Sequence, residues 1–180
     1  AIGNNYFRYF DLLVATAITT SGQLSIRWVE KSFNIYLNRI LKTTGVDYVI
    51  ASDTDSVYVT FESLVAEKFK SGEQTSEIVN FLDAFAKEEL EPFIDKSYEA
   101  LAKRMNAYDQ KMQMAREAIA STGIWTAKKR YILNVWDMEG VRFKEPYLKI
   151  MGIEAVKSST PAPCREKIKQ ALKIIINGDE

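Results

Sequence analysis

Residues 48–61 read Y-V-I-A-S-D-T-D-S-V-Y-V-T-F, and this stretch governs the interpretation of the rest of the chain. β-Branched and aromatic residues fill both of its ends, whereas its centre, residues 52–56, is polar. The end residues favour strands and the central Asp and Ser residues favour a turn, so the stretch predicts a β-hairpin. Asp53 and Asp55 are two residues apart and would share one face of an extended backbone.

Two neighbouring carboxylates repel each other unless a cation lies between them. Oxygen ligands suit a hard ion such as Mg²⁺, which keeps several waters and binds one or two carboxylates together with substrate phosphates. An isolated D-x-D is a weak signal, because most such triplets are turns or caps. The flanking strands strengthen it, since placing two carboxylates between buried strands costs repulsion and desolvation. Asp53 and Asp55 therefore predict a metal-assisted site for phosphoryl-type chemistry.

Length and composition indicate one domain, or one large piece of a longer protein. The chain has 180 residues, of which 47% are hydrophobic and 27% charged, enough to bury a core. It contains no signal peptide and no apolar run of about 18 residues, so neither export nor a membrane span is indicated. Cys164 is the single cysteine and histidine is absent, which excludes an internal disulfide, a cysteine-rich zinc site and histidine-dependent catalysis within this chain.

Positive charge is concentrated in the second part of the chain, although the net charge is zero. Residues 1–120 hold 13 Lys and Arg against 17 Asp and Glu, whereas residues 121–178 hold 11 against 5. This asymmetry suggests an acidic half that carries the site and a basic half that grips a partner. Ordinary scatter of surface charge is the alternative explanation.

Two basic segments lie in the second half. Residues 128–131 read K-K-R-Y and predict strand cations that contact nucleic-acid phosphates, with the tyrosine packing on a sugar or base. The alternative is a solvated strand edge, where lysines prevent edge-to-edge pairing. Residues 149–161 predict an extended backbone that follows phosphates, or else a plain connector. The candidate contacts in both segments are Lys128, Lys129, Arg130, Tyr131, Lys149, Gly152, Lys157, Ser158, Ser159 and Thr160.

Apolar residues at helical spacing predict two long helices. The first begins at an Asp11 N-cap and runs to Lys42, with Gly45 as its C-cap, and the second is kinked or broken at Pro92. Together with the hairpin they predict an α+β fold: a mainly antiparallel sheet with long helices packed on one face and the two aspartates on the open face. The other expected elements are a helix over 62–70, a loop over 71–73, a cap at Thr75 or Ser76, strands over 112–120, 128–136 and 141–143, an edge position at Pro146, an extended connector over 157–163 and a helix over 165–177.

The motif residues resemble those of a known family. Residues 53–56, D-T-D-S, follow a hydrophobic strand and resemble the third catalytic motif of family B DNA polymerases, Y-G-D-T-D-S, while K-K-R-Y matches a second motif of that family. Ser52 stands where the family usually has Gly, and Ala51 where the motif has Tyr. The resemblance covers nearly the whole chain and is closest to the replicative members from T-even-type bacteriophages, through residues 7–11, 15–20, 131–140, 149–152 and 157–161.

The resemblance implies a palm-type fold, with residues 1–150 as the palm subdomain and residues 151–180 as the base of the thumb. In this family a carboxylate of D-T-D joins an aspartate of an earlier motif to hold two Mg²⁺, for which Mn²⁺ can substitute. A primer 3′-hydroxyl then attacks the α-phosphate of a dNTP, and pyrophosphate leaves. By position, Asp55 matches the essential ligand and Asp53 its neighbour, while the residues from Lys128 onward match the grip on primer-template DNA.

Other parts of such a polymerase are not recognisable in the sequence. The D-x-x-S-L-Y-P-S motif with the partner aspartate is absent, and the chain begins with Ala rather than Met, which suggests the interior of a longer protein. We therefore expect the chain alone to be inactive, and to need the exonuclease, fingers and thumb parts. The resemblance also implies a sliding clamp as a partner only through residues beyond this chain, no membrane, and action in the cytoplasm of a phage-infected bacterium.

Two other functions fit a D-x-D motif. A nucleotide-sugar glycosyltransferase would use it to hold Mn²⁺ and a diphosphate, and would carry alternating strands and helices before the motif. A non-catalytic nucleic-acid-binding domain would carry it as an incidental acidic turn. The long helix expected before Asp53 disfavours the glycosyltransferase, and metal binding that depends on Asp55 would separate the polymerase from the binding domain.

Overall fold

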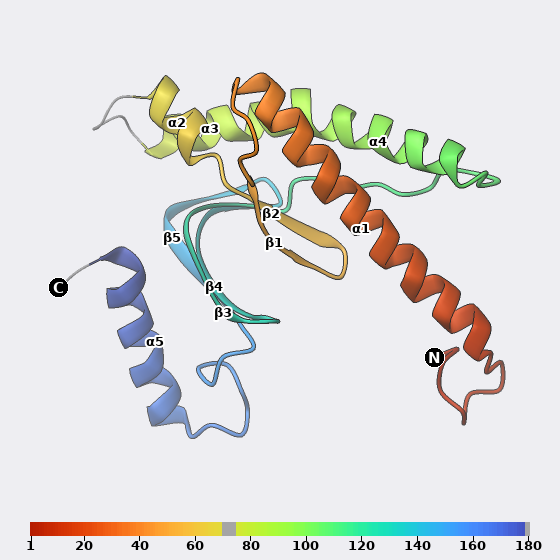
Figure 1. Cartoon of the computed structure of the whole chain (residues 1–180). Helices are drawn as coiled ribbons and strands as arrows, with labels where there is room; N and C mark the ends of the chain where they lie inside the picture. The colour runs from red at the N-terminus through yellow and green to blue at the C-terminus, as the bar shows by residue number, and fades with distance from the viewer. Residues whose placement is uncertain (70–74, 179–180) are drawn as a thin grey trace. The chain divides into compact units, whose positions relative to one another are not determined.

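The computed structural model describes residues 1–69 and 75–178 and has an α+β fold with antiparallel strand pairs, as the sequence predicts (Figure 1). The strands form two sheets rather than one: a pair, β1-β2, and a three-stranded sheet in the order β3-β4-β5. The chain divides into two compact units, Ala1–Glu73 with Glu89–Met114, and Gln74–Glu88 with Ala115–Glu180. We call these unit 1 and unit 2 and describe each separately.

Unit 1 is built on the long helix α1, Leu12–Ile40. The Asp11 side chain accepts a hydrogen bond from the Val14 backbone N–H at 3.0 Å, which confirms the predicted N-cap. The prediction for the other end is wrong: the C-cap is Leu41, followed by Lys42 at φ 52°, and Gly45, although its φ is also positive at 71°, does not cap the helix. Gly45 lies farther along, in the loop that leads to the first strand.

The core of unit 1 lies between the second half of α1 and helix α4, Glu91–Arg104. Both helices bury residues at spacings of three and four, so one apolar stripe of each helix meets the other. Figure 1 shows the two helices crossing. Tyr36 and Phe93 stack with their ring centroids 4.1 Å apart, and the Trp28 indole N–H donates to the Ser97 carbonyl at 3.0 Å. The buried residues of the two stripes are Val29, Phe33, Tyr36, Leu37, Ile94, Ser97, Tyr98 and Leu101.

The second long helix is interrupted where Pro92 predicts a break. Helix α3, Thr75–Phe85, continues through one π-helical turn, Ala86–Leu90, into α4. A proline ring collides with the carbonyl four residues earlier, here that of Glu88, and the wider π turn makes room for it. The π turn also contains the boundary between the two units, which falls between Glu88 and Glu89.

The predicted hairpin consists of β1, Val49–Asp53, and β2, Ser56–Val59, and is followed by α2, Glu62–Lys68. Neutral side chains of α1 hold its base. The Asn34 side-chain oxygen accepts from the backbone N–H groups of Tyr48 and Val49 at 2.9 and 3.1 Å. The loop predicted over residues 71–73 lies outside the described residues. The prediction of a cap at Thr75 or Ser76 is wrong, because α3 begins at Thr75 and both residues belong to the helix.

Unit 2 contains the three-stranded sheet of β3, Ala118–Ala127, β4, Arg130–Met138, and β5, Val141–Met151. The first strand begins at Ala118 rather than Met112, and it runs through residues 121–127, which alternation alone had not assigned to a strand. The turn between β4 and β5 places Glu139 and Gly140 at positive φ, 51° and 85°. Pro146 lies on the edge strand β5, as predicted.

A cluster of charged side chains joins helix α3 to this sheet. Arg116 pairs with Asp83 of α3 at 2.6 Å and with Asp137 of β4, which is fully buried, and Arg142 of β5 also contacts both aspartates. Burial raises the pKa of Asp83, but hydrogen bonds from Lys87 and Arg116 outweigh this and hold the pKa below its ordinary value. These ion pairs stabilise the packing of α3 on the sheet only while the carboxylates are ionised.

The segment after β5 is a series of turns rather than the predicted extended connector. Backbone bonds Val156 N to Ile153 O, 3.1 Å, and Thr160 N to Lys157 O, 3.1 Å, close two of these turns, and Ala155 is buried among them. Helix α5, Ala162–Asn177, follows and begins three residues earlier than expected. Among the residues that the structure describes, no helix combines the length and apolar character needed to cross a membrane.

Candidate metal-binding and nucleic-acid-binding residues

The two candidate metal ligands lie at the tip of the β1-β2 hairpin. Asp53 pairs with Ser56, so Thr54 and Asp55 form a two-residue loop, and the Asp55 N–H donates to the Asp53 carbonyl at 2.6 Å. Thr54 has φ 54°, which is rare for a β-branched residue. Two hydroxyls brace the turn: Thr54 Oγ1 donates to Asp53 Oδ1 at 3.0 Å, and Ser56 Oγ donates to the Asp53 carbonyl at 3.1 Å.

The backbone between the two aspartates is not extended as the sequence predicts. The positive φ of Thr54 shows that it turns there, so strand geometry does not place Asp53 and Asp55 on one face. Asp53 ends a strand and is half-buried, whereas Asp55 is an exposed loop residue. The tight turn brings both residues to one hairpin tip, and a strained turn of this kind is often found at a functional site.

The carboxylates at this tip suit a hard cation but supply only part of a coordination shell. Within the described residues, no group of three or more Asp, Glu, Cys or His is placed to hold a metal ion. Mg²⁺ commonly takes one or two carboxylates and completes its shell with waters and phosphates, so the donor set at this tip fits that ion. The pair would need a further ligand from a substrate or from another carboxylate.

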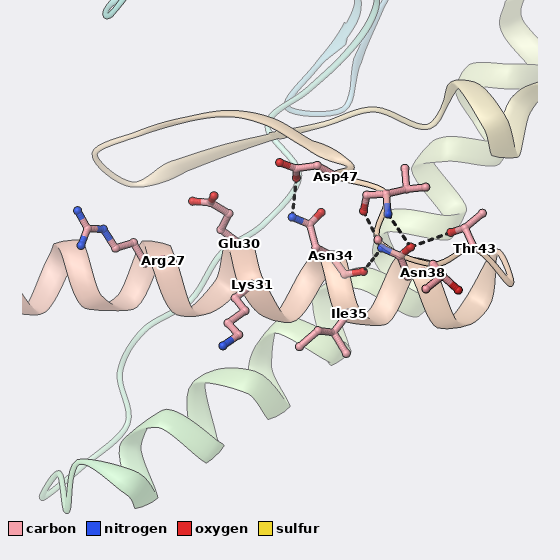
Figure 2. Close-up of a pocket in the computed structure, with 11 residues that line it drawn as sticks. Arg27, Glu30, Lys31, Asn34, Ile35, Asn38, Thr43 and Asp47 are labelled. Carbon is pink, nitrogen blue, oxygen red and sulfur yellow. Dashed lines mark hydrogen bonds between the residues drawn. The ribbon is translucent and has the colours of Figure 1, made fainter.

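Unit 1 also has a surface hollow of about 630 Å³ between α1 and residues 43–47 (Figure 2). Asn38 spans it, donating to the Val46 carbonyl at 2.7 Å and accepting from the Val46 N–H at 3.0 Å, while Asn34 donates to Asp47 at 2.6 Å (Figure 2). Neither candidate metal ligand lines this hollow. The hydrogen bonds of Asn34 and Asn38 across this hollow fix the loop that enters β1.

The basic candidates are not arranged as three strand cations. Ala127 pairs with Arg130, so Lys128 and Lys129 form the two-residue turn of the β3-β4 hairpin, with Lys129 at φ 60°. Both lysines are exposed at this tip. Arg130 is the first residue of β4, and its Nε donates to the Gly152 carbonyl at 3.1 Å while its Nη2 pairs with Glu154.

Tyr131 does not fit the predicted role of packing against a sugar or base. Its side chain is 6% exposed, and its ring lies 6.4 Å from that of Trp125 on the neighbouring strand. Burial in the sheet explains this position, because Tyr131 pairs across to β5 as well as to β3. Tyr131 therefore packs within unit 2, whereas Lys128 and Lys129 of the same motif are exposed.

The remaining candidates occupy the end of β5 and the turns beyond it. Lys149 is mostly buried and pairs with Glu117 at 2.6 Å, so its ammonium already has an anionic partner. Lys157, Ser158 and Ser159 are exposed in the turns after β5, and Thr160 is half-buried. Gly152 has φ 66°, and a Cβ there would lie 2.1 Å from the Lys129 carbonyl oxygen. Gly152 therefore allows the segment after β5 to approach the basic turn.

The acidic and basic candidates belong to different units: Asp53 and Asp55 to unit 1, and the cations from Lys128 to Lys157 to unit 2. Whether the two groups share one surface stays a prediction. The sequence did not reveal two residues that position these elements: Asn34, which holds the base of the β1-β2 hairpin, and Glu154, which pairs with Arg130 beside the basic turn. Glu154 precedes Lys157 by three residues and pairs with it at 2.9 Å, a spacing that could have indicated the contact.

Over its whole length the chain is similar to one segment of DNA-directed DNA polymerases, which confirms the resemblance to the phage enzymes. It is 44% identical over 189 aligned residues to the DNA-directed DNA polymerase of Escherichia phage RB69, and 42% identical over 192 to that of Enterobacteria phage T4. Each alignment covers all of this chain and 21% of the polymerase, so the chain spans about a fifth of the length of these curated relatives. No protein-family model matches the chain.

Proposed function

We propose that this chain is the palm part of a family B DNA-directed DNA polymerase, with residues 1–150 in the palm subdomain and residues 151–180 beginning the thumb. In that role it serves nucleotide transfer from a dNTP to a primer 3′-hydroxyl in DNA replication. The observation that carries the proposal is the identity of 42–44% along the entire chain to two phage polymerases. The two polar hairpin tips agree with it, because they bear the residue types that metal ions and phosphates require.

Asp53 and Asp55 are the proposed metal ligands, and Asp55, exposed at the apex of the turn, is the principal one. The chemistry that two bound Mg²⁺ supply is a lowered pKa of the attacking hydroxyl and stabilisation of the in-line transition state. The chain's own part is to position the carboxylates: Thr54 Oγ1 bonds the Asp53 carboxylate, and Ser56 Oγ bonds the Asp53 backbone carbonyl and braces the turn that carries Asp55. The partner aspartate must come from outside this sequence.

The cations of unit 2 are the proposed grip on primer-template DNA. Lys128 and Lys129 project from a turn, as phosphate contacts do, and Lys157, Ser158, Ser159 and Thr160 offer further donors. Lys149 would act through its pair with Glu117, and buried Tyr131 would support the sheet beneath the turn. The glycosyltransferase alternative gains no support, because all strand pairs in the described residues are antiparallel.

A metal titration tests the acidic site. Mn²⁺ binding to the chain is measured by electron paramagnetic resonance in the presence of a dNTP. The affinity for Mn²⁺ should fall at least about tenfold in Asp55→Asn, since one of few ligands is lost. Asp95→Asn removes an exposed carboxylate from α4 and serves as the matched control. Equal Mn²⁺ binding by the unaltered chain and Asp55→Asn would remove the acidic turn from the proposal.

Two further measurements separate the alternatives. Salt-dependent binding of primer-template DNA that weakens in Lys129→Ala fits both a polymerase part and a plain binding domain, whereas metal binding that depends on Asp55 fits only the polymerase part. We also expect no incorporation of labelled nucleotide by the chain alone on a primed template, because the D-x-x-S-L-Y-P-S aspartate is absent from its sequence. Incorporation by the chain alone would contradict that expectation. Stabilisation of the fold by a UDP-sugar would instead favour a glycosyltransferase.

A further inference from the structure

One carboxylate in unit 2 pairs with two of the cations proposed to contact DNA. Glu154 accepts from Arg130 Nη2 and from Lys157 Nζ, the latter at 2.9 Å. All three side chains are exposed by about two-fifths to one half, so the cluster faces solvent rather than the interior. We call Arg130, Glu154 and Lys157 the Glu154 cluster.

The backbone at Gly152 lies close to Lys129 and Arg130 beside this cluster. The Gly152 carbonyl accepts from Arg130 Nε at 3.1 Å, so the guanidinium is anchored at one end and meets Glu154 at the other. A side chain at Gly152 would collide with the Lys129 carbonyl and lie 3.2 Å from Arg130 Cγ. These contacts hold the cluster directly beside the turn that carries Lys128 and Lys129.

Glu154 stays ionised across the whole useful range of pH. A hydrogen bond from Lys157, a backbone hydrogen bond and the positive charge of Arg130 together hold its pKa at about 2. Protonation therefore does not release the two cations under ordinary conditions. Release requires another anion of suitable geometry to replace the carboxylate, and a phosphate diester is such an anion, because a guanidinium binds carboxylate and phosphate oxygens alike.

We propose that Glu154 occupies the position of a nucleic-acid phosphate when DNA is absent, and that a backbone phosphate of primer-template DNA displaces it from Arg130 and Lys157. The proposal rests on the DNA-binding part of the proposed function and adds a positioning residue to it. Glu154 keeps the two cations oriented toward solvent beside the Lys128–Lys129 turn, and it lowers the affinity of the chain for DNA, since each contact with a phosphate must first break an ion pair.

Glu154→Gln tests this, because it keeps the side-chain shape and removes the charge. The dissociation constant for a fluorescent primer-template duplex is measured by anisotropy over a series of KCl concentrations. We expect Glu154→Gln to bind about two- to tenfold more tightly, the range set by two exposed ion pairs. The slope of log K against log salt should stay nearly the same, since Arg130 and Lys157 contact phosphate in both complexes and Glu154→Gln removes only the competing carboxylate.

Glu166→Gln is the matched control. Glu166 is an exposed carboxylate of the same unit, paired with Lys169 at 3.1 Å with the same three-residue spacing, but it belongs to α5 and not to the cluster. It should leave the dissociation constant nearly unchanged. The double variant Arg130→Gln with Glu154→Gln should lose most of the gain in affinity, and circular dichroism checks that every variant is folded.

The outcomes separate this inference from the function on which it rests. If neither the unaltered chain nor Glu154→Gln binds the duplex at low salt, the DNA-binding function itself fails. If the unaltered chain binds and Glu154→Gln binds equally or more weakly, the function stands and the displacement of Glu154 is wrong. An equal gain in Glu166→Gln would also overturn the inference, because the effect would then come from net charge alone.

Discussion

The acidic and basic turns have the same length but are supported in different ways. Each is a two-residue hairpin loop with one non-glycine residue in the left-handed region, Thr54 at φ 54° and Lys129 at φ 60°. The acidic turn is braced from within, by hydroxyl groups one and three residues from Asp53. The basic turn also has one local hydroxyl bond, from Thr126 to the Arg130 carbonyl at 3.2 Å, but in addition it is braced by a segment 22 to 24 residues away, through Gly152 and Glu154.

This difference suggests what each turn requires. A local brace orients the Asp53 carboxylate and holds the turn that carries Asp55, as the proposed metal site requires. A distant brace joins the basic turn to further donors after β5, which is what contact with an extended phosphate chain needs. The following substitutions test the two kinds of support, from the largest expected effect to the smallest.

Gly152→Ala should break the distant brace. Its Cβ would lie 2.1 Å from a backbone oxygen, and φ 66° is unfavourable for alanine, so we expect a loss of about 2 to 4 kcal/mol in the free energy of unfolding. Gly140→Ala is the control, because Gly140 has φ 85° but open space around it, and it should cost only about 1 kcal/mol. Urea unfolding followed by circular dichroism measures both, and equal losses would show that crowding at Gly152 is unimportant.

The packing of α3 on the three-stranded sheet of unit 2 should depend on pH. The folded-state pKa of Asp83 lies below its ordinary value of 3.8, so its contribution is present above that value and is lost as pH falls through the folded pKa. Asp83→Asn should therefore lower the stability by about 1 kcal/mol at neutral pH, and the difference from the unaltered chain should shrink below about pH 4. Urea midpoints across this range measure it, with Asp95→Asn as control. A difference that is constant with pH would contradict the ion-pair explanation.

Thr54→Gly tests the acidic turn and should have the smallest effect on stability of these substitutions. Glycine removes the strain of φ 54° but also the Thr54 hydroxyl bond to Asp53, so we expect a net gain of only about 0.5 kcal/mol in unfolding free energy. Lys129→Gly relieves the same kind of strain in the basic turn, φ 60°, and serves as the comparison. A clear loss of stability in Thr54→Gly alone would show that the hydroxyl brace outweighs the strain.

Much of the fold could be predicted from local sequence, because its strongest signals are local. Helical spacing and the Asp11 cap fixed the start of α1, and the polar centre of residues 48–61 fixed the first hairpin. Pro92 indicated the interruption between α3 and α4. The start of β3 was missed because residues 112–117 alternate like a strand but have no partner strand to pair with.

The candidate site was harder to predict, since its geometry depends on turns and on distant contacts. Nothing in K-K-R-Y distinguishes two turn lysines from three strand cations, and only the pairing of Ala127 with Arg130 decides it. The burial of Tyr131 depends on strands on both sides of β4. The contact between Arg130 and Glu154 joins residues 24 apart, which no local pattern reveals.

The π turn at Ala86–Leu90 separates helix α3, which packs in unit 2, from helix α4, which packs in unit 1. A π turn holds one residue more than an α turn, and one residue corresponds to about 100° of rotation around the axis. The buried side of α3, which includes Val79, and that of α4, which includes Ile94, are therefore set independently, each within its own unit. Deleting a single residue here would remove the wider turn, and the ring of Pro92 would then collide with the carbonyl four residues before it.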